Sequence, residues 1–239
     1  MRRALAAGLL AATAVHAAPA VTAFAPARRA LLPELTGTGR RDHVALTFDD
    51  GPDPASTPHF LRLLAAHDIR ATFFVLGAML DRHPALGRDM LAAGHELAVH
   101  GWTHRCLLWR TPRGTYDDLA RARDLVASLG DDRPRWFRPP YGVLTTGALV
   151  AGRRLGLQPK LWTAWGRDWE ARATPTSITR TVTSTLIGGG TVLLHDSDCT
   201  SAAGSWQRTL AALPRIIGWA QDRGLRLGTL AAHQQAVPR

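Results

Sequence analysis

The sequence predicts an α/β fold, a single domain organised as a distorted (β/α) barrel of about seven strands. From Asp42 onward, short apolar runs alternate with helical stretches, which is the pattern of βα units around a largely parallel sheet. The length of 239 residues is enough for one sizeable core. The polar residues that stand out follow predicted strands, and α/β folds place their chemistry at the carboxyl ends of strands.

The first strand of the domain is expected at 44–49, an alternating run that ends in Asp49 and Asp50. Gly51 and Pro52 then stop the strand. Neighbouring residues on an extended chain point in opposite directions, so we expect one acid to hold a cation and the other to act as a base. An Asp-Asp-Gly-Pro surface turn would explain the four residues alone equally well.

The elements that follow are expected at regular intervals along the chain. Thr57 is expected to cap a helix that has Pro58 in its first turn. Further strands are predicted at 71–76, 97–99, 136–138, 158–162, 191–194 and 225–229. Further helices are predicted near 85–93, 114–129, 146–155, 177–187 and 206–222.

The amino-terminal residues have the pattern typical of an export signal. Met1-Arg2-Arg3 is followed by an apolar run to Val15, with small residues nearby for cleavage, although an Ala-rich amphipathic helix fits the same residues. We expect a signal peptide at 1–20, a linker at 21–41, the catalytic domain at 42–231 and a tail at 232–239. The protein is then secreted or associated with the cell envelope, and removing 1–41 should leave the domain folded.

The net charge of +10 does not point to nucleic acid as a partner. Six arginines and one glutamate in the first 41 residues carry half of that excess. No basic cluster with interleaved aromatic residues follows, so nucleic-acid binding is not expected. No run of about 18 apolar residues is apparent, and no transmembrane segment is expected in the mature protein. The oligomeric state is left open.

Two histidines, His100 and His104, stand four residues apart. On a helical turn this spacing puts both rings on one side, where they can bind one metal. Together with Asp50 they form a two-His, one-carboxylate set that leaves metal positions open for chemistry. Non-haem iron oxygenases use the same set, so iron is an alternative to zinc at this point.

Five motifs in this order resemble the polysaccharide deacetylase family, also called the NodB-homology group or carbohydrate esterase family four. The resemblance covers about residues 42–231. It implies a (β/α) barrel and metal-dependent N- or O-deacetylation of amino sugars or acetylated glycans. The motifs are Thr47-Phe48-Asp49-Asp50-Gly51-Pro52, His100-x-x-x-His104, Arg138-Pro139-Pro140-Tyr141-Gly142, Asp168-Trp169 and Leu193-Leu194-His195-Asp196.

The resemblance also implies a role for each matching residue. The metal, most simply zinc, would be bound by Asp50, His100 and His104. Asp49 resembles the general base and Arg138 the residue that pairs with it, while His195 resembles the general acid and Asp168 its partner. The Tyr141 N–H would face the oxyanion, and Trp169 and Leu193 would wall the acetyl pocket.

Two positions depart from the family pattern. Gly101 stands where the family has Ser or Thr, and Trp165 stands where it has an Asp. The tryptophans near the motifs are Trp102, Trp162, Trp165, Trp169 and Trp206. We expect half or more of them in the core and one or two stacked on a sugar.

The leading interpretation is a secreted zinc deacetylase of N-acetylated sugars or acetylated glycans. An iron oxygenase is disfavoured by the βα alternation, because such ligands normally sit on antiparallel strands. A catalytically weak glycan-binding protein would not need Asp49, Arg138 and His195 together. Cys106 follows His104 and Cys199 follows His195. If the deacetylase interpretation is right, both histidines face one substrate, so the two cysteines lie near the same site and we expect that they can pair as a disulfide.

Overall fold

The computed structural model describes residues 2–130 and 133–235, and its centre is a parallel sheet. Eight strands follow the order β5-β4-β3-β2-β1-β7-β6, with β8 added beside β1. All their pairings are parallel. The strands are β1 (His43–Asp49), β2 (Thr72–Val75), β3 (Glu96–Val99), β4 (Trp136–Phe137), β5 (Gln158–Pro159), β6 (Ala164–Trp165), β7 (Thr191–His195) and β8 (Arg226–Gly228).

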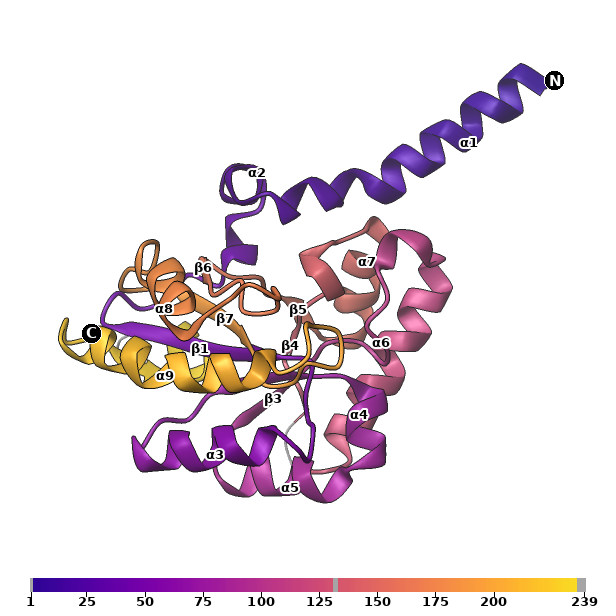
Figure 1. The fold of residues 1–239 in the computed structure, drawn as a ribbon. Coiled ribbons are helices and arrows are strands. Elements are labelled where there is room, and N and C mark those ends of the chain that lie inside the picture. Colours follow the sequence, from indigo (N-terminus) through magenta and orange to yellow (C-terminus); the bar gives the residue numbers. More distant parts are fainter. Residues whose placement is uncertain (1, 131–132, 236–239) are drawn as a thin grey trace.

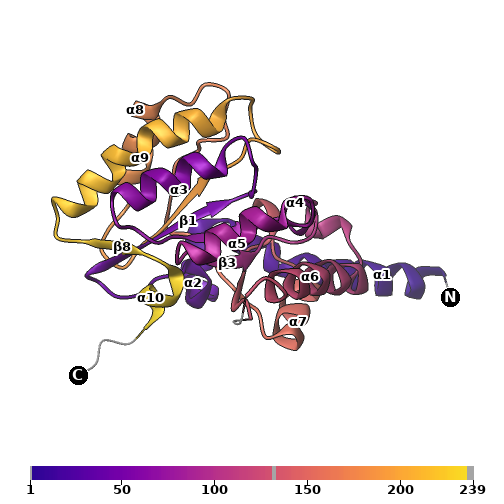
Figure 2. The same cartoon turned by 90° about the horizontal axis from the view of Figure 1, so that it is seen from below.

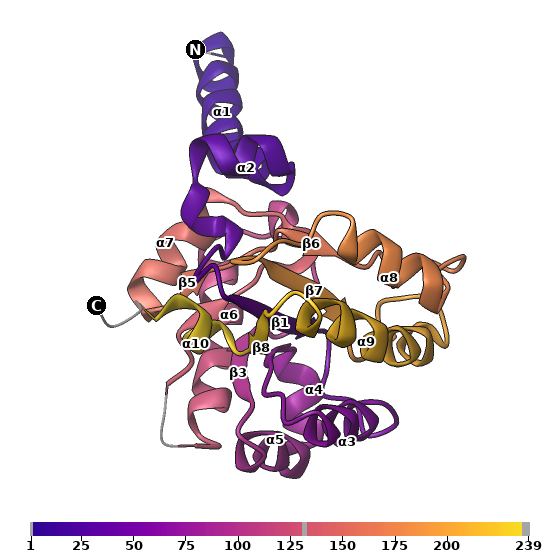
Figure 3. The same cartoon turned by 90° about the vertical axis from the view of Figure 1, so that its left-hand side faces the viewer.

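Helices surround the curled sheet on several sides (Figures 1, 2 and 3). One group, α3 to α5, lies below the sheet in Figure 1, while α6 packs on α7 and α8 packs on α9 at its two flanks. The helices are α3 (Thr57–Ala66), α4 (Gly77–Arg82), α5 (Pro84–Ala92), α6 (Pro112–Ala127), α7 (Thr146–Leu155), α8 (Pro175–Thr183), α9 (Ser205–Gln221) and α10 (Leu230–Gln234). The predicted single-domain (β/α) barrel is therefore confirmed.

Strand β1 is the centre of the core because both of its faces are covered. All seven of its residues are buried, as expected for a strand inside a parallel sheet. The Phe48 ring packs between the rings of Phe60 and Phe73, with centroid distances of 5.3 Å and 5.1 Å. The end of β1 is held rigidly by this packing, which fixes the position of the acids that follow.

The amino-terminal segment consists of α1 (Arg2–Ala17), η1 (Ala18–Ala23), α2 (Ala25–Leu31) and η2 (Pro33–Thr36). Helix α1 projects from the body, whereas α2 lies close to it (Figure 1). Helical turns therefore occupy much of the expected linker. The end of the segment packs into the core, since Leu35 is only 1% exposed. The division of the chain into signal peptide, linker and domain stays a prediction.

The expectation that the chain has no run of about 18 apolar residues was wrong. Residues Ala6–Ala23 are long and apolar enough to cross a membrane, with a mean hydropathy of 1.4. The apolar character continues past Val15, because small residues such as Ala17 and Ala20 follow it. A signal sequence satisfies the same criterion, so this stretch fits either a leader or an anchor.

Candidate active site

The predicted site residues meet at the carboxyl ends of the parallel strands. Asp49, at the end of β1, lies opposite His195, at the end of β7. They line a cavity of about 210 Å³. A larger hollow of about 770 Å³ lies between α1 and helices α6 and α7, and contains none of the predicted site residues. The small cavity is lined by Asp49, Asp50, His100, His104, Tyr141, Trp169, Leu193 and His195, with Arg138 and Asp168 buried behind it.

Asp50, His100 and His104 bring three possible metal-ligand atoms within 4.8 Å of one another. Oδ1 of Asp50 lies 3.5 Å from Nε2 of each histidine. This oxygen is buried and has no hydrogen-bond partner among the described residues. Since an unpartnered buried carboxylate oxygen is costly, the donor set fits a bound cation.

The tautomer of His100 is set by the chain itself. Its Nδ1 donates a hydrogen bond of 2.8 Å to the carbonyl of Arg138, which leaves the Nε2 lone pair facing Asp50. Burial lowers the pKa of His100 to about 3, so the ring is neutral. A neutral imidazole with Nε2 free is the form that binds a metal.

The backbone at Asp50 differs from the extended chain that the sequence predicted for the two acids. Asp50 has a left-handed backbone, with φ of 81°, so the chain is not extended there. Asp49 Oδ2 also approaches His100 Nε2, at 3.7 Å. Thr200, on the loop after β7, donates a hydrogen bond of 2.5 Å to Asp50 Oδ2. The expectation that the acids point in opposite directions was wrong.

Asp49 is paired with a buried guanidinium. Arg138 Nη1 donates to Asp49 Oδ1 at 2.6 Å and to the Thr47 hydroxyl at 2.9 Å. Burial raises the pKa of Asp49, while the charge of Arg138 opposes that shift. One carboxylate oxygen is therefore held by the arginine, and the other faces the cavity.

His195 forms a second charged pair across the cavity. Its Nδ1 lies 2.9 Å from Asp168 Oδ1, and its backbone N–H donates to Asp168 Oδ2 at 2.8 Å. Burial opposes the charged ring, but the charge and hydrogen bond of Asp168 dominate and raise the pKa of His195 to about 10. The ring is thus protonated, and Nε2 is the nitrogen left for the cavity.

Aromatic rings form one wall of the cavity. Trp162 and Trp165 stack with centroids 5.7 Å apart, and Trp165 lies 5.2 Å from Trp169. All three line the cavity, so the expectation that half or more of the five tryptophans belong to the core was wrong. Trp165, where the family has an acid, is 38% exposed and extends this wall.

The loop that carries the histidines is not a helical turn. Residues 100–104 have no helical hydrogen bonding, and Gly101 has φ of 96°. A Cβ at Gly101 would lie 2.9 Å from Asp118 Oδ2, an oxygen that accepts the Trp102 N–H at 2.8 Å. Asp118, from α6, thus braces the loop next to Gly101, the position where the family has Ser or Thr.

Sequence reasoning missed Thr200 and Asp118, because no local motif marks a residue whose partner is far along the chain. It also allowed a disulfide that the structure lacks, since Cys106 and Cys199 are free thiols. Cys199 Sγ instead contacts the Asp50 carbonyl at 3.6 Å.

Comparison with known proteins gives consistent matches over most of the chain. A family model described as "Polysaccharide deacetylase" matches residues 36–159. A chitooligosaccharide deacetylase of Bradyrhizobium sp. (strain ANU 289) is 37% identical over 195 residues, which cover 78% of this chain and 88% of that protein. A peptidoglycan-N-acetylglucosamine deacetylase of Bacillus cereus is 32% identical over 190 residues, covering 79% and 86%.

A solved structure shares the fold as well. It is a peptidoglycan N-acetylglucosamine deacetylase in complex with 4-naphthalen-1-yl-N-oxidanyl-benzamide. The TM-score is 0.77 at 27% sequence identity, with 84% of this chain and 92% of that chain covered.

Proposed function

The chain belongs to the polysaccharide deacetylase family, and from that premise we propose that it hydrolyses the acetamido group of N-acetylglucosamine units in a chitooligosaccharide or peptidoglycan. The observation that carries the proposal is the unpartnered Asp50 oxygen between two imidazoles, with Asp49 on one side. The protonated His195 belongs to the same cavity. Amide hydrolysis needs this combination of a base, an acid and a Lewis-acid site.

Asp50, His100 and His104 would hold a divalent metal, most simply zinc. Two neutral imidazoles and a carboxylate with open positions are a ligand set typical of catalytic zinc. Bound there, the metal supplies Lewis acidity that activates water and polarises the acetyl carbonyl. An N-hydroxybenzamide, the ligand of the related solved structure, is a metal-chelating group, which supports the same assignment.

Asp49 would accept the proton of the attacking water. Its Oδ2 faces the cavity, whereas Oδ1 is held by Arg138 at 2.6 Å. The guanidinium keeps the carboxylate oriented, and its charge favours the ionised form. Because Asp49 is not needed as a ligand, it can change protonation state without releasing the metal.

His195 would donate a proton to the leaving nitrogen from the other side of the cavity. Asp168 holds its Nδ1, so the proton leaves from Nε2. The backbone N–H of Tyr141, in the left-handed turn at φ of 61°, would face the developing oxyanion. Trp169 and Leu193 would bound the space for the acetyl methyl group.

The two alternatives fit less well. An iron oxygenase is set aside because the chain belongs to a hydrolase family and its strand pairs are parallel. A glycan-binding protein without activity would have no use for two preserved charged pairs, Asp49–Arg138 and His195–Asp168.

We propose that the enzyme acts outside the cytoplasm, at or beyond the cell envelope. The support is the apolar stretch Ala6–Ala23 after two arginines. Amino-terminal sequencing of protein from the native host is the test. We expect a start near Ala17–Ala20, and an intact Met1 in a cytoplasmic fraction would refute export.

An acetate-release screen tests the proposed reaction. Metal-reconstituted protein is offered chitin oligomers, peptidoglycan and acetyl-xylan, and we expect release from one of the N-acetylated substrates. Asp49→Asn serves as the matched control, since it should keep the metal and lose turnover by about a hundredfold or more. Equal release by wild type and Asp49→Asn would refute the assigned base, and release from acetyl-xylan alone would make the enzyme an esterase.

A further inference from the structure

Three consecutive carbonyls at the open edge of the sheet are bound by two buried arginines. The strand order ends at β5 and β6, and residues 160–163 connect these two strands. Arg138 donates to the carbonyls of Lys160 and Leu161, at 3.1 Å and 2.9 Å. The next carbonyl, that of Trp162, accepts from Arg28 Nη2 at 2.9 Å. One guanidinium belongs to the site, and the other comes from the amino-terminal segment.

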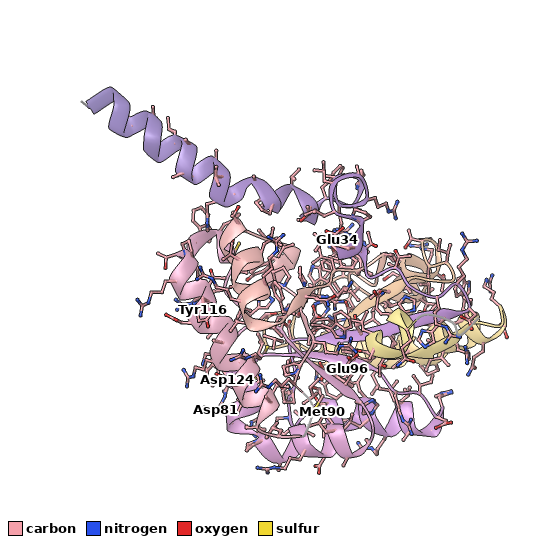
Figure 4. All side chains as sticks on the ribbon, turned by 180° about the vertical axis from the view of Figure 1, so that it is seen from behind. Glu34, Asp81, Met90, Glu96, Tyr116 and Asp124 are labelled. Atoms are coloured by element: carbon pink, nitrogen blue, oxygen red, sulfur yellow. The ribbon has the colours of Figure 1, made fainter. Side chains whose placement is uncertain are left out.

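The segment 18–36, called the arm below, runs along this open edge. The Leu161 N–H donates to the Leu35 carbonyl at 2.7 Å. Lys160 Nζ donates to the Glu34 carbonyl at 3.0 Å. Glu34 lies where the arm reaches the body of the molecule (Figure 4). The arm therefore covers the gap that the strands leave in the barrel.

Burying the Arg28 guanidinium costs free energy, and its hydrogen bonds within the arm do not by themselves account for that burial. Its side chain is 3% exposed, and burial, followed by the charges of Arg29 and Arg138, lowers its pKa to about 10. Nη1 donates to the carbonyls of Thr22 and Ala23 within the arm. A buried charge next to another cation is costly unless its donors are hydrogen-bonded, and Nη2 meets this need at the Trp162 carbonyl outside the arm.

Trp162 connects Arg28 to the catalytic cavity. Its ring lines that cavity and fills the space beside Gly142, where a Cβ would lie 2.7 Å from the ring. Gly142 directly follows Tyr141, and both have left-handed backbones in η4 (Pro140–Gly142). The first part of the arm, η1, also packs against η4. The arm thus touches the Tyr141 turn both directly and through Trp162.

We propose that Arg28 is a positioning residue, which holds Trp162 and through it the Tyr141 turn in the geometry for catalysis. The inference rests on the proposed function, in which the Tyr141 N–H faces the oxyanion. Arg28 touches no reacting atom. Loss of Arg28 should lower kcat, because a displaced oxyanion donor weakens mainly the stabilisation of the transition state.

The test compares Arg28→Met, Arg28→Lys and Arg29→Met in the full chain. Arg29 is the exposed neighbour on α2 and serves as the matched control. We expect Arg28→Met to lower kcat about tenfold, since small misplacements at an active site have effects of this size or larger. KM and the zinc affinity measured by chelator competition should stay the same, and Arg28→Lys should recover part of kcat. Arg29→Met should match wild type.

Hydrogen exchange gives a second measurement that does not depend on turnover. In Arg28→Met, we expect faster amide exchange in peptides that cover 158–163 and 140–143, with the rest of the sheet unchanged. A lower Tm with unchanged kcat and exchange would overturn the positioning role. If wild type releases no acetate, the proposed function fails, while the exchange data still decide whether Arg28 orders the Tyr141 turn. If Arg28→Met does not fold, Arg28→Lys against Arg29→Met carries the same comparison.

Discussion

At the scale of single residues, Arg138 connects the catalytic groups to the fold. Its guanidinium holds Asp49, and its backbone carbonyl accepts the hydrogen bond that orients His100. The same guanidinium lies 3.9 Å from the Phe74 ring centroid and has no exposed surface. Removing such a partner leaves a buried carboxylate uncompensated, which costs about 3–5 kcal/mol in comparable cases. The base, one proposed metal ligand and the loop at 160–161 therefore depend on one side chain.

Trp165 offers a test of substrate binding at the residue scale. Its exposed ring extends the aromatic wall, so we expect it to stack on a sugar ring next to the one that reacts. Trp165→Ala should raise KM for a chitin oligomer about threefold to tenfold, which corresponds to the loss of one stacking contact. Turnover of a small acetyl ester should stay unchanged, because that substrate does not reach the wall.

Trp109→Ala is the control for this experiment. Trp109 is 88% exposed and does not line the cavity, so its loss should change neither substrate. A Trp165→Ala variant that loses activity equally on the oligomer and the small ester would contradict the stacking role.

At this scale the sequence predicted which residues meet at the cavity, with Arg138 and Asp168 beside them, but it missed partners that come from distant parts of the chain. Asp49, His100 and His195 lie in short motifs at strand ends, where the position follows from the alternation of elements. Thr200 meets Asp50 from 150 residues away, and Arg28 meets Trp162 from 134 residues away. Such contacts arise from the closed tertiary structure, and no local pattern marks them.

At the scale of elements, the loop from His100 to Arg110 is braced by a side chain from α6. Asp118 accepts the Trp102 N–H and pairs with Arg110 Nη2 at 2.7 Å. Asp118→Ala should lower the free energy of unfolding by about 1–3 kcal/mol, because a buried N–H loses its acceptor. The affinity for zinc should fall as well, since His100 and His104 lie on the same loop.

Urea unfolding and chelator competition measure the two effects. Asp117→Ala is the matched control, because the pair of Asp117 with Arg113, at 3.7 Å, is exposed. It should change stability by less than about 0.5 kcal/mol. Unchanged zinc affinity in Asp118→Ala would show that the brace is not needed for the ligands.

A second element-scale prediction concerns pH and the histidine pair where β1 meets α10. His43 Nδ1 lies 3.1 Å from His233 Nδ1, and His233 Nε2 lies 3.1 Å from the Gly189 carbonyl. Since a carbonyl only accepts, His233 Nε2 carries its proton and His43 Nδ1 is the donor between the rings. A second proton on His43 would go to Nε2 and leave this bond in place, but the charged ring is disfavoured by its burial and by the charges of Arg226 and Arg40, with Asp42 opposing them.

Burial, followed by the charge of His233, lowers the pKa of His43 to about 4, below its ordinary 6.5. The unfolded chain therefore binds more protons between these values, and stability is lost as the pH falls from 6.5 toward 4. We expect His43 to account for about 1–3 kcal/mol of the loss between about pH 7.5 and about pH 5. Urea unfolding should show a smaller loss in His43→Gln, and no difference from wild type in the exposed His67→Gln.

The elements differ in how far the sequence could predict them. Helix α7 was predicted to the residue, and its strong periodicity ends at Gly156, which has φ of 70°. Strand β6 was missed, because the strand expected at 158–162 ends before it. Thr57 was expected as a cap, but its hydroxyl donates to Asp196 at 2.5 Å and the residue lies inside α3. For β6 and Thr57, contacts with residues far along the chain determine the structure.

At the scale of the whole molecule, the arm makes the barrel complete. Composition indicated a linker, because 18–41 is rich in Ala, Pro, Gly and Thr and no periodicity is visible. The packing of the arm comes instead from backbone pairs, one buried arginine and Leu35, which joins the cluster that contains Phe137 and Leu155. Pairing across more than a hundred residues is not encoded in local composition.

The last prediction separates the two parts of the amino-terminal segment. A protein that starts at Ala18 loses α1, a helix that projects from the body and accepts a hydrogen bond of 2.5 Å from the Thr146 hydroxyl at the Val15 carbonyl. We expect its stability to fall by less than about 1 kcal/mol and its acetate release to match the full chain. This start also agrees with the expected cleavage near Ala17–Ala20.

A protein that starts at Asp42 loses the arm, and the expectation that it folds normally is revised. Removal of Leu35 leaves a hole in the core worth about 2–5 kcal/mol, and the Leu161 N–H loses its acceptor. We expect urea unfolding at a clearly lower midpoint and acetate release reduced about tenfold or more, because Trp162 loses its support. Equal midpoints and equal turnover for the proteins starting at Ala18 and Asp42 would show that the arm is a linker after all.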